Sequence, residues 1–336
     1  MKTRKRLLAM VPAMAMVFAL VACSGDTGGT SDPGADPGES SSAAGGTGEV
    51  YVVGICQQAT HDALDAATQG FKDALIAEFG EDGVRFEEGN AGNEFANCGT
   101  IVDGFLAEGV DLILANATYP LQAAASATSD IPILGTSVTN YETALGTVGD
   151  NVSGTSDLAP LDEQAAMIQE LFPDAENVGL LYCSGEPNSV YQVTTIQGYL
   201  EEMGYTCTQY AFTDANDLPS VTQTACDGSD VIYIPTDNTA ASCTEAINNV
   251  ALVEGVPIVA GEEGLCKGCG VASLSISYYD LGYVTGKMAL EILTEGADIS
   301  TMEIRYAPQT TKMYNASICE TLGITVPEDY VAVAEE

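Results

Sequence analysis

Short apolar runs alternate along the chain with longer segments in which apolar residues recur every three or four positions. The first run, at 50–55, has the sequence Val-Tyr-Val-Val-Gly-Ile and predicts a buried strand, and Leu64, Phe71 and Leu75 then share one face of a helix expected at 63–79. The alternation continues over further strands and helices, which predicts a parallel sheet with helices on both faces. These elements are strands at 84–88, 112–115 and 131–134 and helices at 95–108 and 121–128.

The second half of the chain repeats the pattern of the first. The strand expected at 178–183 is similar to 52–56, and Gln-Gly-aromatic triplets begin at Gln69 and Gln197. The run from 230 to 259 repeats the strand, Ala-Ala-Ser and strand order of 111–134. We therefore expect an α/β protein with two similar doubly wound parallel-sheet lobes, and ligands of such sheets bind beyond the carboxyl ends of the strands.

A third part follows the two repeats. It contains a strand at 271–275, a long amphipathic helix at 276–293, a strand at 303–306 and a short helix at 318–322. Extra elements after two complete lobes indicate that the chain crosses back between them, so that several crossovers form a hinge. The expected N-terminal lobe comprises 49–154 and 276–306, and the expected C-terminal lobe comprises 155–275 and 307–336.

The N-terminus indicates the compartment. Residues 2–6 are mostly basic, 7–22 are apolar but too few for a membrane span, and the run ends in Leu-Val-Ala-Cys23. This order is typical of a bacterial lipoprotein signal peptide at 1–22, with Cys23 as the lipid-modified residue. Residues 24–48 are almost all small or polar and predict a flexible linker. We expect an extracytoplasmic protein, anchored to the cell membrane through lipid on Cys23.

The charge excludes several partners. The chain has 48 acidic and ten basic residues, a formal charge of −38, and four of the basic residues lie in the first six positions. The part from Cys23 onward therefore carries −42. Such a surface repels nucleic acid and anionic lipid headgroups. Because none of the six remaining basic residues follows a predicted strand, a neutral zwitterion is favoured as ligand over a phosphate or a dicarboxylate.

Catalytic patterns are weak. Gly282 to Lys287 is one residue too short between its glycines for a phosphate-binding loop and lies in a helical pattern. The only histidine, His61, precedes a helix and either lines the cleft or caps the helix. Cys266 and Cys269 lie in a glycine-rich stretch without the second cysteine pair that a zinc site needs. We expect no enzyme activity, no metal and no cofactor.

Nine cysteines follow Cys23, and an extracytoplasmic location favours disulfides among them. An odd number leaves at least one thiol free or paired between chains. We expect the pairs Cys56–Cys98, Cys207–Cys226 and Cys266–Cys269, and leave Cys183, Cys243 and Cys319 unassigned.

Polar residues follow the predicted strands of both lobes. Hydroxyls and amides at helix N-termini suit a carboxylate, which we assign to Thr118 and Thr139, whereas Asp237 is the expected partner of an ammonium group. Tyr119 and Tyr279 are expected to stack on a planar group. Helix capping alone explains any single position equally well, but the set on both lobes predicts a cleft for a small zwitterion. Its members are Gln58, Thr118, Tyr119, Thr139, Ser184, Asn188, Ser189, Thr236, Asp237, Asn238, Tyr279 and Asp280.

Several motifs together resemble one family, the TrpX-like ABC transporter substrate-binding lipoproteins. The likeness covers essentially the whole chain after the linker. The resemblance implies a type I periplasmic-binding-protein fold, delivery of a ligand to an ABC permease in the membrane, and an amino acid as the ligand. Characterised members of this family bind aromatic amino acids. The motifs are Asp65-Ala-Ala-x-Gln-Gly-Phe71, Ala123-Ala-Ala-Ser-Ala-Thr128, Glu186-x-Asn-Ser189, Pro235-Thr-Asp-Asn-Thr239, Ala260-Gly-Glu-Glu-Gly264 and Tyr278-Tyr-Asp-Leu-Gly-x-x-x-Gly-Lys287.

Three alternatives stay open at this point. The first is a receptor of the same fold for a nucleoside or a sugar. The second is a sensor subunit that signals to a membrane protein instead of transporting. The third, an extracellular enzyme, is disfavoured by the single histidine and the missing nucleophile motif.

Overall fold

The computed structural model describes residues 50–334. The expected signal peptide, the lipid anchor at Cys23 and the linker lie outside the described residues. Within 50–334, none of the helices has the length and apolar character needed to cross a membrane.

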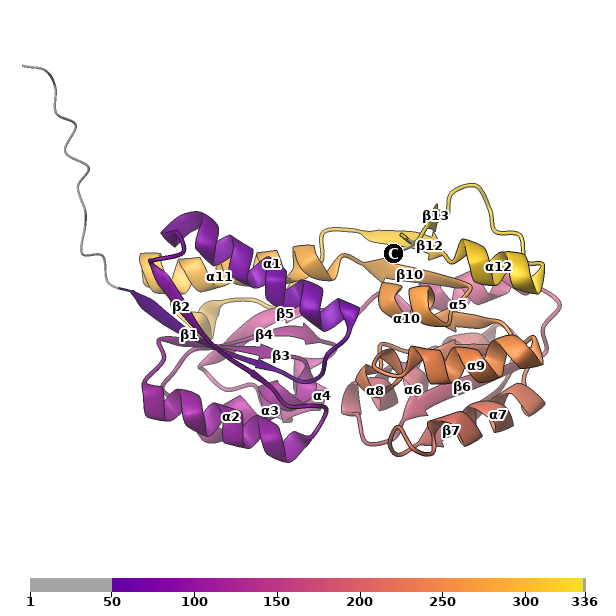
Figure 1. Cartoon of the computed structure of the whole chain (residues 1–336), viewed down its shortest axis with the longest axis horizontal. Helices are drawn as coiled ribbons and strands as arrows, with labels where there is room; N and C mark the ends of the chain where they lie inside the picture. The colour runs from indigo at the N-terminus through magenta and orange to yellow at the C-terminus, as the bar shows by residue number, and fades with distance from the viewer. Residues whose placement is uncertain (1–49, 335–336) are drawn as a thin grey trace, which may run out of the picture. The chain divides into compact units, whose positions relative to one another are not determined.

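The first sheet has six parallel strands and is called the N-lobe sheet (Figure 1). Its spatial order is β11-β5-β4-β3-β1-β2. β11, the last strand of this sheet in chain order, therefore lies at one edge. The strands are β1 (Tyr51–Gln57), β2 (Val84–Asn90), β3 (Leu112–Asn116), β4 (Ile133–Val138), β5 (Val152–Ser156) and β11 (Arg305–Tyr306).

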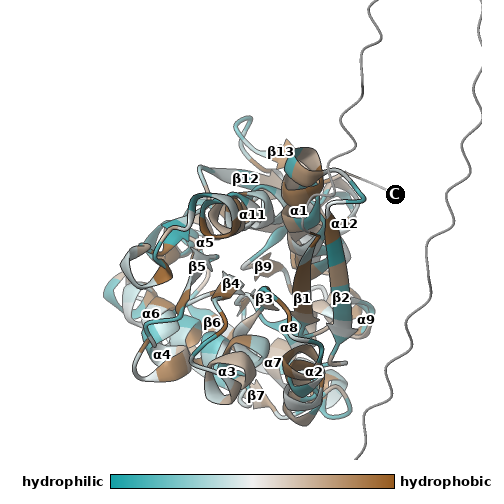
Figure 2. Cartoon of the chain, turned by 90° about the vertical axis from the view of Figure 1, so that its left-hand side faces the viewer, coloured by the Kyte–Doolittle hydropathy of each residue, from teal (hydrophilic) through white to brown (hydrophobic). Residues whose placement is uncertain are grey.

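Helices cover both faces of the N-lobe sheet because its central strands are apolar on both sides. In β3, Leu112 and Leu114 pack in one hydrophobic cluster and Ile113 and Ala115 in another, as the two-residue period of a strand requires. In Figure 2, β1 is hydrophobic along most of its length. One face carries α1 (Asp62–Phe79) and α11 (Tyr278–Glu295), which lie side by side although far apart in sequence (Figure 1). The remaining helices are α2 (Phe95–Glu108), α3 (Thr118–Ala127), α4 (Tyr141–Leu145) and the 3₁₀ turn η1 (Ile299–Thr301).

The second sheet has seven strands in the order β13-β12-β10-β9-β8-β6-β7 and is called the C-lobe sheet. The strands of this sheet pair in parallel, except that β10 pairs with β12 in antiparallel orientation. The strands are β6 (Asn177–Cys183), β7 (Thr206–Phe212), β8 (Val231–Ile234), β9 (Ile258–Ala260), β10 (Ala272–Ile276), β12 (Thr310–Tyr314) and β13 (Val331–Ala332).

The C-lobe sheet is also covered on both faces. Tyr182 and Tyr233 belong to the hydrophobic cluster on one face, and Leu181 and Ile232 to the cluster on the other. The first face carries α5 (Leu161–Leu171), α6 (Pro187–Glu202) and α12 (Ala316–Leu322), and the second carries α7 (Leu218–Gly228), α8 (Asn238–Ala241), α9 (Thr244–Glu254) and α10 (Glu263–Gly268).

The expected architecture of two parallel-sheet α/β lobes is confirmed. The chain passes from the N-lobe sheet to the C-lobe sheet after β5, returns between β10 and α11, and crosses once more between β11 and β12. The long helix begins at Tyr278, two residues later than expected, because β10 continues to Ile276.

The cysteines differ from expectation, because all nine in the described chain are free. Cys207 and Cys226 belong to hydrophobic clusters on opposite faces of the C-lobe sheet and cannot approach each other. The thiols of Cys56 and Cys98 contact each other in the interior of the N-lobe without a bond between the sulfur atoms.

The glycine-rich stretch that contains Cys266 and Cys269 is a short helix, α10, and not the expected loop. Glu262 caps this helix by accepting hydrogen bonds from the backbone N–H groups of Gly264 and Leu265. The Cys269 thiol donates to the Leu265 carbonyl, 3.4 Å away, and the buried Cys266 thiol lies 4.0 Å from the Gly270 carbonyl. The local cysteine pair is therefore not bonded.

Candidate functional site

The segments that follow the strands of the two sheets meet along one line, called the interlobe line. It is marked by contacts between Asn93 and Thr239, Tyr119 and Gly185, and His61 and Asn238. The Tyr119 hydroxyl of the N-lobe donates to the Gly185 carbonyl of the C-lobe at 2.6 Å. Asn93 Nδ2 donates to Thr239 Oγ1 at 2.6 Å, and His61 Nε2 lies 3.2 Å from the Asn238 side-chain oxygen. These contacts show that the two lobes lie together with the carboxyl ends of their strands facing each other, which is where doubly wound sheets bind ligands.

Backbone strain is concentrated on the N-lobe side of this line. Only three non-glycine residues in the described chain have a positive φ, namely Asn93 at 63°, Ala117 at 91° and Ser137 at 55°. Each lies at or just after the carboxyl end of a strand of the N-lobe sheet. A β-carbon makes this conformation costly, and such strain typically gathers at functional sites.

Glu186 organises the facing segment of the C-lobe. Its carboxylate is 1% exposed and accepts four hydrogen bonds from the start of α8. The donors are the backbone N–H of Asn238 (3.0 Å), its side-chain amide (2.7 Å), the backbone N–H of Thr239 (2.9 Å) and the Thr239 hydroxyl (2.7 Å). Glu186 thereby fixes the segment that carries three of the expected ligand residues.

Asp237 is a second buried carboxylate beside Glu186. It accepts hydrogen bonds from the backbone N–H of Cys183 (2.7 Å) and of Ala240 (2.9 Å), and contacts the Ser189 side chain. Burial, followed by the charge of Glu186, raises the pKa of Asp237 to about 7. Asp237, the residue expected to bind an ammonium group, thus already caps helix α8 in this structure.

A third buried carboxylate, Asp157, lies where the chain leaves β5. Thr139 Oγ1 donates to one of its oxygens at 3.0 Å and the Tyr278 hydroxyl to the other at 3.1 Å. Gln192 Nε2, from α6 of the C-lobe, donates to Thr139 Oγ1 at 3.4 Å. The Tyr278 hydroxyl also bonds to Thr236. This network connects both lobes with two of the chain crossovers.

The structure buries most of the other expected residues along the same line. Gln58 is fully buried, accepts from the Tyr119 backbone N–H at 3.1 Å and donates to Asn93 at 2.9 Å. Thr118 is 3% exposed at the start of α3. Asn188 donates to the Thr236 carbonyl at 3.0 Å. Ser184 is exposed, and its hydroxyl donates to the carbonyl of Phe212.

Two expected residues lie elsewhere. The Tyr279 hydroxyl donates to Asp73 of α1 at 2.8 Å, on the outer surface of the helix pair α1 and α11. Asp280 is exposed, and its backbone N–H binds the capping Ser277 hydroxyl. Tyr279 lines an interlobe cavity of about 230 Å³, but neither side chain joins the hydrogen-bond network that the neighbouring Tyr278 enters.

His61 lines the cleft and does not cap α1. It occupies the N-cap position without a side-chain hydrogen bond to the helix, and its ring contacts Asn238 of the other lobe. Burial lowers the pKa of His61, so the ring is neutral at neutral pH.

Two buried polar atoms along this line have no hydrogen-bond partner, one from each lobe. They are Ser137 Oγ, at the end of β4, and Asn188 Oδ1, in the first turn of α6. Their side chains belong to residues that are 6% and 7% exposed. An unsatisfied buried polar atom costs about 1–3 kcal/mol, so both atoms indicate a place where a polar ligand would be held.

Cavities open between the lobes around this line. One of about 310 Å³ lies between Thr60 and His61 of the N-lobe and Ala241 and Ser242 of the C-lobe. Another of about 230 Å³ adjoins Tyr278 and Glu262. A third of about 550 Å³ is lined by α6, Ser184 and Gly185 of the C-lobe with Thr143 of the N-lobe.

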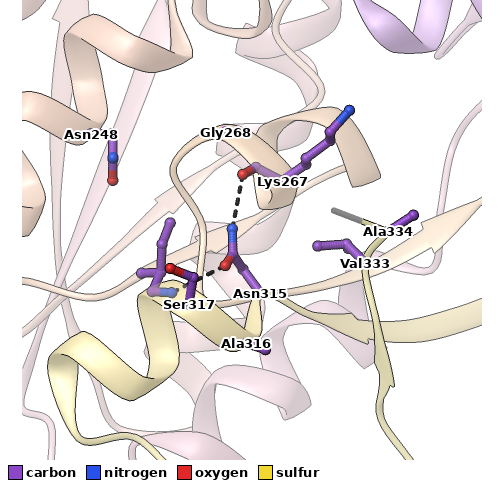
Figure 3. Close-up of a pocket in the computed structure, with 9 residues that line it drawn as sticks. Asn248, Lys267, Gly268, Asn315, Ala316, Ser317, Val333 and Ala334 are labelled. Atoms are coloured by element: carbon purple, nitrogen blue, oxygen red, sulfur yellow. Dashed lines mark hydrogen bonds between the residues drawn. The ribbon is translucent and has the colours of Figure 1, made fainter. Parts of the chain in front are cut away.

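A separate cavity of about 450 Å³ lies within the C-lobe (Figure 3). Asn315 points into it and donates to the Lys267 carbonyl at 2.8 Å, while its oxygen caps α12 through the Ile318 N–H at 3.1 Å. Asn248, Val333 and Ala334 complete much of the lining. Because one lobe supplies the whole lining, closure of the two lobes does not form this cavity.

Three important residues were absent from the expected set: Asp157, Tyr278 and Glu186. Asp157 follows β5, whose sequence Val-Ser-Gly-Thr-Ser gives no apolar strand pattern. Tyr278 precedes Tyr279 and Asp280 in one motif, and only the latter two were chosen from it. Glu186 begins the motif Glu-x-Asn-Ser and is one of the polar residues that follow the strand expected at 178–183, but only Ser184, Asn188 and Ser189 were chosen from them.

Comparisons with known proteins agree with this geometry. The family model described as ABC transporter substrate binding protein matches residues 52–336. A tyrosine-binding protein of Clostridioides difficile (strain R20291) is 32% identical over 279 residues, which are 81% of each chain. More distant solved structures, under 25% identical, share the type I periplasmic-binding-protein fold.

Two related structures differ in the presence of a ligand. One, from Streptococcus pneumonia, is described as an ABC domain in complex with L-Trp; it is 30% identical, with a TM-score of 0.79, and the match covers 83% of this chain and 97% of that one. The other is a ligand-free, open substrate-binding protein from Clostridium difficile, 33% identical, with a TM-score of 0.66 and coverage of 85% and 100%.

Proposed function

The chain belongs to the ABC transporter substrate-binding protein family, and from this premise we propose that it is an extracytoplasmic receptor for an aromatic amino acid. The observation that carries the proposal is the line of buried polar residues between the lobes, with unpartnered atoms on Ser137 and Asn188. The L-Trp complex and the tyrosine-binding relative support the ligand class. Tyr119, whose ring packs edge-on against Phe95 with centroids 5.5 Å apart, offers an aromatic surface at this line.

The proposed mechanism is closure without chemistry. An open state exposes the strand ends of both lobes, a ligand bridges them, and its differential affinity for the closed state shifts the population. The hydrogen bonds of Tyr119 with Gly185 and of Asn93 with Thr239 then hold the lobes together. The segments that bend are the crossovers, of which two meet at Asp157 and Tyr278.

The ligand class is tested by a thermal-shift panel of the twenty amino acids, four nucleosides and common sugars with the purified protein. A ligand that binds only the folded state raises the melting temperature, by an amount that grows with its concentration relative to Kd. We expect the largest increases with L-tyrosine or L-tryptophan. A response confined to nucleosides or sugars would instead establish the receptor for that class, and would contradict the amino acid proposal.

We further propose that Cys23 carries the lipid anchor and that the anchored protein delivers its ligand to an ABC permease. Replacing Cys23 with alanine is expected to abolish incorporation of radiolabelled palmitate, release the protein from the membrane fraction and lower cellular uptake of the labelled amino acid. Palmitate labelling that persists in the variant would contradict the anchor. Unchanged uptake after deletion of the gene would favour a sensor over a transport receptor.

A further inference from the structure

Both lobes carry a large negative charge. In the N-lobe, residues 50–156 and 278–306 include 20 acidic and four basic side chains, a formal charge of −16. In the C-lobe, residues 157–277 and 307–334 include 21 acidic and two basic side chains, a formal charge of −19. Like charges repel each other, and in 0.1 M salt this repulsion is screened only beyond about 10 Å. Closure of the cleft therefore brings together two surfaces that repel each other.

Lys267 supplies positive charge where the two lobes meet. Its ammonium nitrogen lies 3.2 Å from a carboxylate oxygen of Asp62, which joins α10 of the C-lobe to the first turn of α1 in the N-lobe. The backbone carbonyl of Lys267 binds Asn315, and the side chain extends away from that contact (Figure 3). The other ion pairs between described residues each lie within one lobe. Separation of α1 from α10 would break the Lys267–Asp62 pair.

Acidic side chains of both lobes surround this ion pair. Asp62, Glu262 and Lys267 line both interlobe cavities of about 230 and 310 Å³, and Glu263 lines the smaller one. The approach is close, because a β-carbon added at Gly264 would lie 3.4 Å from the Asp62 β-carbon. Burial, followed by the charges of Glu263 and Asp62, raises the pKa of Glu262 to about 7. Asp62 thus acts unfavourably on a carboxylate of the opposite lobe, and the Lys267 ammonium group lies where it reduces this repulsion.

We propose that Lys267 is an electrostatic latch of the closed state, which pairs with Asp62 and offsets the repulsion between Asp62 and Glu262. The inference goes beyond the identity of the ligand, because it concerns the equilibrium between the open and closed states, but it rests on the proposed closure. A contact that forms only in the closed state raises ligand affinity by shifting that equilibrium. Because the Lys267 and Asp62 side chains are 31% and 64% exposed, the effect is modest and depends on salt.

The test measures the affinity of Lys267→Gln for L-tyrosine and L-tryptophan by calorimetry at low and high salt. We expect Kd to rise at least threefold at about 20 mM NaCl and less than about 1.5-fold at 500 mM NaCl, because salt screens the pair. Lys267→Arg keeps the charge and should restore the wild-type Kd. Lys72→Gln is the matched control, since it removes an ion pair of 2.6 Å within the N-lobe and should leave Kd unchanged at both salt concentrations.

A role limited to the folding of α10 predicts a different result. The change in Kd would then be equal at both salt concentrations, and it would be as large in the Asp62→Asn background as in the wild type. The latch predicts a smaller change in that background, because one partner of the pair is already missing. An equal change at both salt concentrations, or in both backgrounds, overturns the inference. Circular dichroism checks that each variant is folded.

The latch is tested separately from the ligand class. If neither amino acid binds to the wild type, the proposed ligand class fails, and small-angle scattering of the unliganded protein decides on the latch. Lys267→Gln should then have a larger radius of gyration than the wild type at about 20 mM NaCl, and 500 mM NaCl should remove the difference. Equal radii at low salt overturn the latch.

Discussion

Replacing Gly282 with alanine is expected to lower the free energy of unfolding by about 3 kcal/mol. Gly282 lies in α11 against α1, and a β-carbon there would come within 1.9 Å of the Ala67 carbonyl oxygen and 2.8 Å of the Ala67 Cα. Both are backbone atoms, so no side chain can rotate away and the two helices must separate. Because α11 follows directly on a chain crossover, the shift also disturbs the hinge. Urea unfolding followed by circular dichroism measures the change.

The matched control is Gly198→Ala in α6. This glycine is exposed within a helix, and an added β-carbon meets no atom within 4 Å. Alanine favours a helix interior over glycine by about 0.5–1 kcal/mol, so this variant should be slightly more stable than the wild type. If Gly282→Ala were as stable as Gly198→Ala, the close approach of α1 and α11 would be wrong.

The second large effect is expected for Glu186→Ala, which should weaken ligand binding strongly and lower stability. Removing this carboxylate leaves the N–H and side-chain groups of Asn238 and Thr239 without their acceptor. Each buried unsatisfied donor costs about 1–3 kcal/mol, and partial rearrangement of α8 is the way to avoid that cost. We expect a loss of about 3 kcal/mol in unfolding free energy, and a loss of affinity of about a hundredfold by calorimetry.

Two further variants separate this effect from a general loss of charge. Glu186→Gln keeps one acceptor oxygen and should fall between the wild type and Glu186→Ala. Glu202→Gln changes an exposed glutamate of α6 and should alter stability by less than about 0.5 kcal/mol. Wild-type affinity in Glu186→Ala would show that the segment 236–239 does not hold the ligand.

The sequence predicted most of the elements that carry a strong hydrophobic period. α1, with Leu64, Phe71 and Leu75 buried, and β6 were placed within two residues of their ends. β5 was missed because it consists largely of buried serine, threonine and glycine, which give no apolar strand pattern. Gly154, with a φ of 139°, packs against Gly135 and Tyr141, and this contact exists only once the sheet has assembled. α10 was missed because its glycines predicted a loop, whereas the N-cap formed by the Glu262 side chain stabilises a short helix there.

The site residues, like the helices and strands, were identified only in part from the sequence. Listing the polar residues after each strand led to Thr139, Asn188 and Asn238, which the structure buries between the lobes. The list contained both adjacent tyrosines at the start of α11, and Tyr279 was chosen. The structure instead bonds Tyr278 to Asp157, because successive helical residues point about 100° apart. Asp157 required knowledge of β5 and of the crossover after it. A strand-end rule thus finds a site only where the strand itself has a recognisable pattern.

The most direct test of the account is a calorimetric titration of the purified protein with L-tyrosine and L-tryptophan at neutral pH. The account predicts that at least one binds with one ligand per chain, with a Kd of about 1 μM or tighter, and with a negative heat-capacity change from closure of the cleft. The absence of binding heat for both amino acids at millimolar concentration, at several temperatures, would contradict it.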